Sequence, residues 1–577
     1  MFYQWNGSRT FDGKTDYLDL SEYLHYFLQS KTLSADITFR TRSAGYLTLL
    51  AVYYKESLLP DFSLSLNKGR VVLTAKRRGG LTVLSGEDAW CDGENHTLSF
   101  RGSDTGVRVY MDGALVIEDS QPGPWCEFGY VGFATVARGV MADQYANFFE
   151  GELLALGFSE ALEPVPEPAG EPRKPRMALF SRGMLGAENF RIPTIVTIDG
   201  GITVASADAR MEAPGDNPNH ICRAIRVSRD SGETWSEPRL MCDFGGIGRT
   251  DGAAAIDGSL LWDAEEKVLF MIFSHTSAGI GSAASTAGTG FEAGRKVLTG
   301  ADGKRYACGE DRRVLDENGA DRLFRQADTS FLKIIESRDG GDTWTEPRDL
   351  NPQIKEEWMR FIGAGPGTGI QLREGPHRGR LIYPVYMSFE GAAAHSSGVI
   401  YSDDHGRTWK LGAPVNDGRQ FEGETIMAAT ASDPRASLGE CQVTELPGGR
   451  LRIFLRNMYT DRTMAAYSDD GGDSWYGLAV QEQLKDPGCQ SHVLRLTHEG
   501  RDLWLFSNPA DGHQRVLGTV RASTDGTKTW SDGHLVEPGE YGYSCMTLLP
   551  DGQIGIMYEG RDITQWFAKF PVEKFLE

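Results

Sequence analysis

A short motif, Ser-x-Asp-x-Gly-x-Thr/Ser-Trp, recurs through the last two thirds of the chain and limits its possible folds more than any other feature. In a hairpin turn of this composition, the Asp side chain accepts backbone N–H groups, the glycine takes a positive φ, and the Trp packs between neighbouring sheets. The motif is therefore a structural element and not a catalytic one. Its copies are Ser228–Trp235, Ser337–Trp344, Ser402–Trp409 and Ser468–Trp475, and a fifth, Ser523–Trp530, has Thr527 in place of the glycine.

The spacing of the copies predicts the number of repeated units. They begin 109, 65, 66 and 55 residues apart, so one unit is about 60 residues long and the first gap holds an excess of about 45. Propeller blades are four-stranded and roughly four to eight of them close a ring. Residues 178–577 then hold about six units. We predict an all-β protein with a six-bladed β-propeller and a small inserted β-subdomain at about 277–328, around Tyr306 and Cys308.

A different pattern precedes the repeats. Residues 161–177 carry five prolines among charged residues, a composition that favours a stiff, extended linker. Before it, Phe62, Leu64 and Leu66 alternate with serines, and a turn at 67–69 leads into a second alternating run. A similar pair of runs surrounds Asp112-Gly113. Residues 1–160 are therefore predicted to form a β-sandwich.

Composition excludes several classes of function. The 59 Lys and Arg against 80 Asp and Glu give a net charge of −21, which argues against a nucleic-acid partner. No apolar run approaches the ~18 residues of a membrane span. The eight cysteines form no C-x-x-C pair, so neither a metal nor another cofactor is expected. No signal peptide is visible, so the protein is either cytoplasmic or secreted with its signal removed.

A further motif gives the repeats a family context. Phe190-Arg191-Ile192-Pro193 lies about 37 residues before the first repeat, and in this arrangement the region from residue 178 onward resembles the bacterial exo-sialidases and trans-sialidases. That resemblance implies release of terminal sialic acid from glycoproteins, glycolipids and sialyl-oligosaccharides. A monomer is expected.

The resemblance implies three arginines that bind the sialic acid carboxylate. The first is Arg191, the second matches Arg456 and the third Arg515, while Arg210 is a further candidate contact to the substrate. Guanidinium groups suit this role because each donates two parallel N–H bonds and keeps its charge. Glu559 matches the family position that orients the first arginine.

The acid, the nucleophile and its base also have matches. The acid is expected at Asp216, 25 residues after the first arginine, with Asp208 as its competitor. A carboxylate nucleophile would be repelled by the substrate carboxylate, whereas a neutral tyrosine would not. The family pairs a tyrosine with a glutamate, here Tyr543 with Glu440. Tyr541 remains a rival, since a residue two positions away on a strand points to the same face.

The product and the class of protein stay open at this stage. A retaining mechanism is expected, in which water as acceptor makes a sialidase and the sugar's own 7-hydroxyl gives a 2,7-anhydro product. A hydrolase for a related nonulosonic acid and a non-enzymatic, glycan-binding propeller are the alternatives. The N-terminal sandwich is similar to the lectin-like module of such enzymes, and Arg138 is its candidate carboxylate contact, with simple structural packing as the alternative.

Overall fold

The computed structural model divides into two units. It describes residues 1–54, 56–77, 79–129, 131–142, 144–166, 176–300, 305–307, 324–326, 328–391 and 394–576. One unit is the chain up to residue 174 together with Leu535–Glu540, which is most of β43 (His534–Glu540), and the other comprises 175–534 and 541–577. The helices among the described residues are α1 (Leu24–Gln29), α2 (Gly248–Asp251) and α3 (Asn351–Ile354). None of the helices described is long and apolar enough to cross a membrane.

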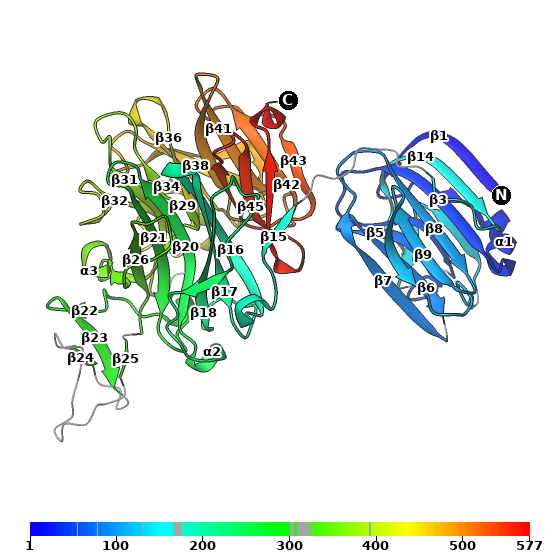
Figure 1. Ribbon diagram of the computed structural model, residues 1–577, viewed down its shortest axis with the longest axis horizontal. Helices are drawn as coiled ribbons and strands as arrows, with labels where there is room; N and C mark the ends of the chain where they lie inside the picture. Colours follow the sequence, from blue (N-terminus) through cyan, green and yellow to red (C-terminus); the bar gives the residue numbers. More distant parts are fainter. Residues whose placement is uncertain are drawn as a thin grey trace. The chain divides into compact units, whose positions relative to one another are not determined.

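Two antiparallel sheets make up the first unit (Figure 1). One has the order β1 (Tyr3–Asp12), β14 (Glu150–Ser159), β3 (Leu33–Arg40), β8 (His96–Ser103), β9 (Gly106–Met111) and β10 (Ala114–Asp119). The other has the order β2 (Leu18–Asp19), β11 (Phe133–Val136), β4 (Tyr46–Tyr53), β5 (Phe62–Asn67), β6 (Arg70–Arg77) and β7 (Gly80–Ala89). A small hairpin joins β12 (Gly139–Met141) to β13 (Gln144–Ala146). Both hairpins that the alternation predicts are present, as β5–β6 and β9–β10.

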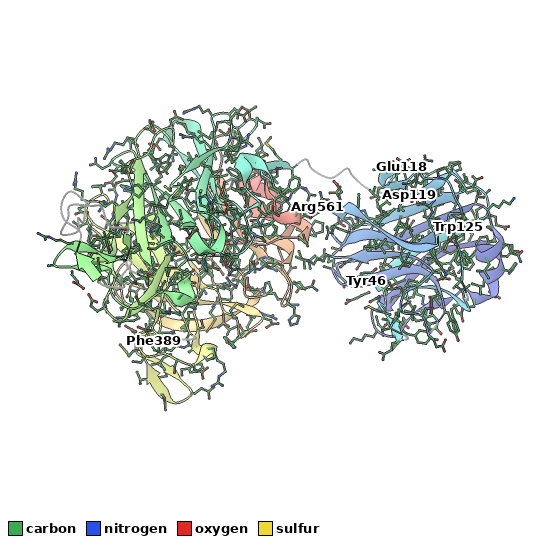
Figure 2. All side chains as sticks on the ribbon, turned by 90° about the horizontal axis from the view of Figure 1, so that it is seen from below. Tyr46, Glu118, Asp119, Trp125, Phe389 and Arg561 are labelled. Atoms are coloured by element: carbon green, nitrogen blue, oxygen red, sulfur yellow. The ribbon has the colours of Figure 1, made fainter. Side chains whose placement is uncertain are left out.

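One core lies between these two sheets. Ile37 and Phe100 come from the first sheet and Leu64 from the second, and all three are fully buried in the same cluster. Trp125, labelled in Figure 2, meets the rings of Phe62 and Phe100 edge-on at centroid distances of 5.2 and 5.9 Å. Burial of aromatic rings from both sheets gives the unit the arrangement of a β-sandwich.

The second unit is a succession of antiparallel sheets. The first group comprises β16 (Asn189–Ile198), β17 (Ile202–Arg210), β18 (Ile221–Ser228) and β19 (Arg239–Met241), and the second β20 (Ala254–Asp263), β21 (Val268–Thr276), β26 (Phe331–Ser337), β27 (Arg348–Asp349) and β29 (Gly367–Thr368). The third comprises β28 (Met359–Ala364), β30 (Ile370–Gln371), β31 (Leu381–Phe389), β32 (Ser396–Ser402) and β33 (Lys410–Leu411). The fourth comprises β36 (Cys441–Glu445), β37 (Leu451–Leu455), β38 (Arg462–Ser468) and β39 (Tyr476–Lys485), and the fifth β40 (His492–His498), β41 (Arg501–Pro509) and β42 (Val516–Ser523). The first two groups connect through the parallel pair Ile221 and Ala254.

A last sheet joins the two ends of this unit. Its order is β15 (Met177–Phe180), β46 (Gln565–Phe570), β45 (Ile554–Glu559) and β44 (Ser544–Leu548), so a strand from the start of the unit pairs with strands from its end, as Figure 1 shows in cyan and red. This pairing closes the succession of sheets into a ring, which is typical of β-propellers.

Short strands fill the gap between β21 and β26. They are β22 (Phe291–Glu292), β23 (Arg295–Gly300), β24 (Arg305–Ala307) and β25 (Phe324–Gln326), and a separate hairpin pairs β34 (Arg419–Phe421) with β35 (Glu424–Ile426). The predicted insertion at 277–328 lies in this gap. Part of it, including Cys308, is outside the described residues.

The repeated motif forms the turn that its composition predicts. In the first copy, Asp230 accepts the backbone N–H of Thr234 at 2.9 Å, and Gly232 has a φ of +79°. The ring of Trp235 meets Phe567 of β46 at 5.3 Å, so the motif packs one sheet against its neighbour. In the fifth copy, Thr527 itself adopts a φ of +65°.

Candidate active site

A tyrosine and a glutamate meet in the second unit although 103 residues separate them. Tyr543 immediately precedes β44 and Glu440 immediately precedes β36. The Tyr543 hydroxyl lies 2.7 Å from both carboxylate oxygens of Glu440, and both side chains are buried. Burial and the charge of Glu440 raise the pKa of Tyr543 well above its usual value, against the opposing effect of nearby arginines. A glutamate in this position can take the phenol proton when the oxygen attacks an electrophile.

Three arginines surround this tyrosine. The guanidinium carbons of Arg191, Arg515 and Arg456 lie 5.0, 5.1 and 5.9 Å from the centre of the Tyr543 ring. Arg191 lies in β16, Arg515 immediately precedes β42 and Arg456 immediately follows β37. Arg456 also donates through Nη1 to Glu440 at 2.6 Å and to the Tyr543 hydroxyl at 2.7 Å. Three converging cations favour a bound anion, and a carboxylate matches their paired donors.

Glu559 holds the first of these arginines in position. Its oxygens accept from Nε and Nη2 of Arg191 at 3.1 and 3.2 Å, and from the backbone N–H of Ile192 at 2.8 Å. Burial raises the pKa of this carboxyl, but the charge of Arg191, the Ile192 N–H and the charge of Arg515 together outweigh burial and lower the pKa. Glu559 therefore stays ionised and fixes the guanidinium plane of Arg191.

Asp216 stands at the mouth of the same site. It lies on the loop between β17 and β18, and its side chain is 65% exposed. Arg210 Nη2 is 2.7 Å from its Oδ1 and Arg191 Nη1 is 3.6 Å away. Partial burial raises the pKa of Asp216, yet the charges of Arg210 and Arg191 outweigh this effect and lower it.

Arg210 is positioned differently from the other candidate arginines. Its side chain is only 1% exposed, and its second nitrogen donates to the carbonyl oxygen of Pro214 at 2.8 Å. A buried guanidinium between Asp216 and Asp208 cannot reach a ligand in the site directly.

Asp208, the competitor for the acid, lies in the interior. It is fully buried on β17 and pairs with the equally buried Arg223. Burial raises its pKa to about 6, while Arg223 and Arg210 oppose the increase. With no exposed surface, Asp208 cannot reach a leaving group, and the geometry favours Asp216 for that role.

The expectation that Tyr541 and Tyr543 point to the same face is wrong. The segment between β43 and β44 is not a strand, so the period of two does not hold there. The Tyr541 hydroxyl lies 2.7 Å from Ser507 Oγ, and its ring stacks on Tyr558 at 4.8 Å. Tyr541 therefore belongs to the packed interior and Tyr543 alone of the two faces Glu440.

A pocket of about 320 Å³ is lined by Arg191, Asp216, Glu440, Arg456 and Tyr543, and by residues that sequence patterns did not single out. Asp257 lies in its wall, fully buried, and accepts a hydrogen bond from the Tyr386 hydroxyl at 3.2 Å. Burial and the neighbouring carboxylates of Asp208 and Glu440 raise the pKa of Asp257 well above its usual value. The other additions are Ile256, Ser282, Phe361, His395, Ser437 and Met458.

The candidate in the first unit has a different environment. Arg138 is buried, and its guanidinium carbon lies 3.4 Å from the ring centre of Tyr17 and 3.9 Å from that of Tyr145. Its Nε donates to the Tyr53 hydroxyl at 3.1 Å. The stacked rings fix the guanidinium plane, which suits either packing or an anion contact.

Known proteins with sequences similar to this chain include sialidases. A family model described as a BNR repeat-like domain matches residues 321–556. The chain is 32% identical to a sialidase of Micromonospora viridifaciens over 69% of its own length and 53% of that protein, and 25% identical to an anhydrosialidase of Macrobdella decora over 67% and 59%. It therefore spans between half and two thirds of the length of these curated relatives.

Solved structures agree on the fold. A leech intramolecular trans-sialidase superimposes with a TM-score of 0.67 at 20% identity over 99% of this chain and 98% of that one. The NanB sialidase of Streptococcus pneumoniae gives 0.68 at 19% identity over 99% of both chains. Sialidases of this type are β-propellers, in agreement with the closed succession of sheets. The chain is therefore similar in sequence to bacterial sialidases over about two thirds of its length, and it shares the fold of solved sialidases.

Proposed function

We propose that the protein is an exo-α-sialidase, a glycoside hydrolase that releases terminal sialic acid from sialylated glycans with retention of configuration. The observation that carries the proposal is Tyr543, which is hydrogen-bonded to Glu440 and surrounded by Arg191, Arg456 and Arg515. A propeller with only a structural role would have no use for a buried tyrosine–carboxylate pair surrounded by three cations. A substrate with a carboxylate on its reacting carbon needs all of these groups.

In the proposed mechanism the three arginines bind the substrate carboxylate and bring the anomeric carbon over the Tyr543 oxygen. Glu440 takes the phenol proton as the tyrosine–carbon bond forms and the glycosidic bond breaks. The tyrosine is neutral beforehand, so it approaches the carboxylate-bearing carbon without charge repulsion. Water then releases the sugar from Tyr543, and two displacements at one carbon give retention.

Asp216 is the proposed acid and base. Its exposure allows it to reach the leaving oxygen, but in the free protein its arginine partners keep it ionised. A substrate carboxylate bound to Arg191 would neutralise part of that positive charge and raise the pKa of Asp216 toward the protonated form. Substrate binding thus prepares the acid that the first step needs, and Arg210 positions it.

The remaining domain assignments rest on the sheet order. Treating the sheet through β16–β18 and the one through β20–β27 as separate units gives a six-bladed propeller over 178–577 with an insertion at about 277–328. The sandwich at 1–160, followed by a linker at 161–177, serves as the lectin-like module, with Arg138 as its proposed anion contact.

A specific observation favours a second candidate function. One relative is named an anhydrosialidase, and the leech structure that shares the fold is an intramolecular trans-sialidase in complex with 2,7-anhydro-Neu5Ac. In that reaction the sugar's own 7-hydroxyl replaces water in the second step. The same tyrosine, acid and arginines would serve both reactions.

NMR of the purified protein with α2,3-sialyllactose separates these possibilities. We expect free sialic acid, appearing first as the α-anomer because the reaction retains configuration. A 2,7-anhydro product would assign the intramolecular reaction instead. No turnover of α2,3 or α2,6 substrates would contradict both, and would leave a glycan-binding propeller or an enzyme for a related nonulosonic acid.

Arg191→Ala is expected to weaken substrate binding. Removing a guanidinium that pairs with a substrate carboxylate costs ~1.5–3 kcal/mol, or roughly 10- to 150-fold in affinity. KM for sialyllactose and the inhibition constant of a sialic acid analogue measure this loss. Arg182→Ala, at an arginine that is 71% exposed and paired with Glu188, is the matched control. Unchanged affinity in Arg191→Ala would contradict the carboxylate-binding role.

A further inference from the structure

A second cluster of reactive side chains lies beside the loop that carries Asp216. His220 immediately precedes β18, Cys222 is the second residue of that strand, and Asp243 follows β19. One ligand atom from each residue lies within 4.8 Å of the others. His220 and Cys222 are buried, whereas the Asp243 side chain is 48% exposed, so the cluster is open to solvent on one side only.

The separations match those between ligands of a single metal ion. His220 Nε2 lies 2.9 Å from Asp243 Oδ1 and 3.4 Å from Cys222 Sγ. With zinc bonds of about 2.0–2.3 Å at tetrahedral angles, neighbouring nitrogen and oxygen ligands are about 3.3 Å apart, and nitrogen and sulfur about 3.5 Å apart. Both separations from His220 are thus within a few tenths of an ångström of those around a bound ion, and the third, between Cys222 and Asp243, lies within 4.8 Å and closes if Asp243 turns toward the thiol.

The other ring nitrogen of His220 has the partner that metal-binding histidines usually have. Nδ1 lies 3.2 Å from Glu212 Oε1, and Glu212 Oε2 accepts the backbone N–H of Gly248 at 3.0 Å. A carboxylate on Nδ1 fixes the ring orientation and leaves Nε2 free for a metal once its proton is lost. Glu212 thus fixes the direction in which Nε2 of His220 faces the other two ligands.

We propose that His220 Nε2, Cys222 Sγ and Asp243 bind a zinc ion, with water as the fourth ligand. Thiolate and carboxylate together balance the two positive charges of zinc, and one proton each leaves the thiol and the imidazole for solvent. The sulfur ligand disfavours calcium and magnesium, which take oxygen ligands. The site lies apart from the tyrosine and the three arginines, and the proposal does not depend on the reaction they carry out.

The sequence predicts no metal site, because its cysteines form no C-x-x-C pair. The ligands here are instead a His-x-Cys pair where β18 begins and an aspartate 21 residues after the cysteine. Pairing of Arg223 with Met241 between β18 and β19 brings the two segments together. Without a metal, the same residues would form only an ion pair between His220 and its two carboxylates, and that is the competing account.

Titration of the metal-free protein with Co²⁺ distinguishes the two accounts, because a cobalt–thiolate bond gives a charge-transfer absorption in the near ultraviolet. We expect the band to saturate at one equivalent and to disappear on addition of Zn²⁺. Cys222→Ser should abolish the band, whereas Cys242→Ser, at the cysteine next to Asp243, should leave it intact.

Two exposed positions keep the test valid if Cys222→Ser fails to fold. Glu212→Gln should weaken Co²⁺ binding by ~10–100-fold, as loss of a carboxylate behind a metal-bound histidine does. Asp243→Asn should weaken it at least as much, and circular dichroism checks the fold of each variant. The absence of a band in the wild type, or its persistence in Cys222→Ser, would overturn the proposal whether or not the protein has sialidase activity.

Discussion

Tyr543→Phe is expected to reduce turnover of sialyllactose by at least ~10²-fold while the protein stays folded. The change removes the oxygen that is proposed to attack the anomeric carbon. The fold should survive because Glu440 keeps its contact with Arg456 at 2.6 Å, so no buried charge loses its last partner. Initial rates measured at saturating substrate test the loss, and thermal unfolding tests the fold.

Tyr541→Phe is the matched control for this experiment. It removes one buried phenol oxygen two residues away, at a position whose hydroxyl meets Ser507 and not Glu440. Loss of that hydrogen bond should cost about 1 kcal/mol of stability and leave kcat within a few-fold of the wild type. If the two variants exchanged phenotypes, Tyr541 would be the nucleophile. Near-normal turnover in both would exclude both tyrosines as the nucleophile.

The repeated turn made much of the fold predictable. Its requirements are local, since the Asp carboxylate and the glycine φ act within eight residues, so the sequence alone reveals each copy. Closure of the ring is a long-range property and was inferred only from the number of repeats. The pairing of β15 with β46, nearly 400 residues apart, depends on edges that no local pattern marks.

The fifth repeat shows where local rules fail. Thr527 occupies a position that favours glycine, yet it keeps the turn with a φ of +65°. Arg452 of the neighbouring sheet donates to its Oγ1 at 2.8 Å. A contact from another sheet thus stabilises a backbone conformation that the residue itself disfavours.

The candidate site was predictable to the extent that its residues lie in motifs. Arg191, Glu440 and Tyr543 were identified from their motifs, and the structure brings them into one pocket. Asp257 was missed because an Asp-Gly pair inside an apolar run is typical of a turn, and its carboxylate reaches the pocket only because its φ is +60°. The contact between Arg210 and Asp216 could not be predicted from the sequence, because it depends on how the loop that carries Asp216 folds back.

Asp216→Asn is expected to reduce turnover of natural sialosides by ~10²–10⁴-fold, the usual contribution of a general acid. Asparagine keeps the size of the side chain and can stay near Arg210, but it has no proton to donate to the leaving oxygen. Lactose is a poor leaving group and needs that proton. A phenol with an electron-withdrawing substituent leaves without one, so the first step should be largely restored on such a substrate.

Comparing kcat/KM on sialyllactose and on a nitrophenyl sialoside measures this difference directly. The ratio kcat/KM reports the steps up to the first irreversible one. It therefore measures the acid-assisted departure of the leaving group separately from the later attack of water. We expect a loss on sialyllactose at least ~10-fold larger than on the nitrophenyl substrate. Equal losses would show that Asp216 supports the site electrostatically, through its pairing with Arg210 and Arg191, and that the leaving oxygen receives its proton from another group.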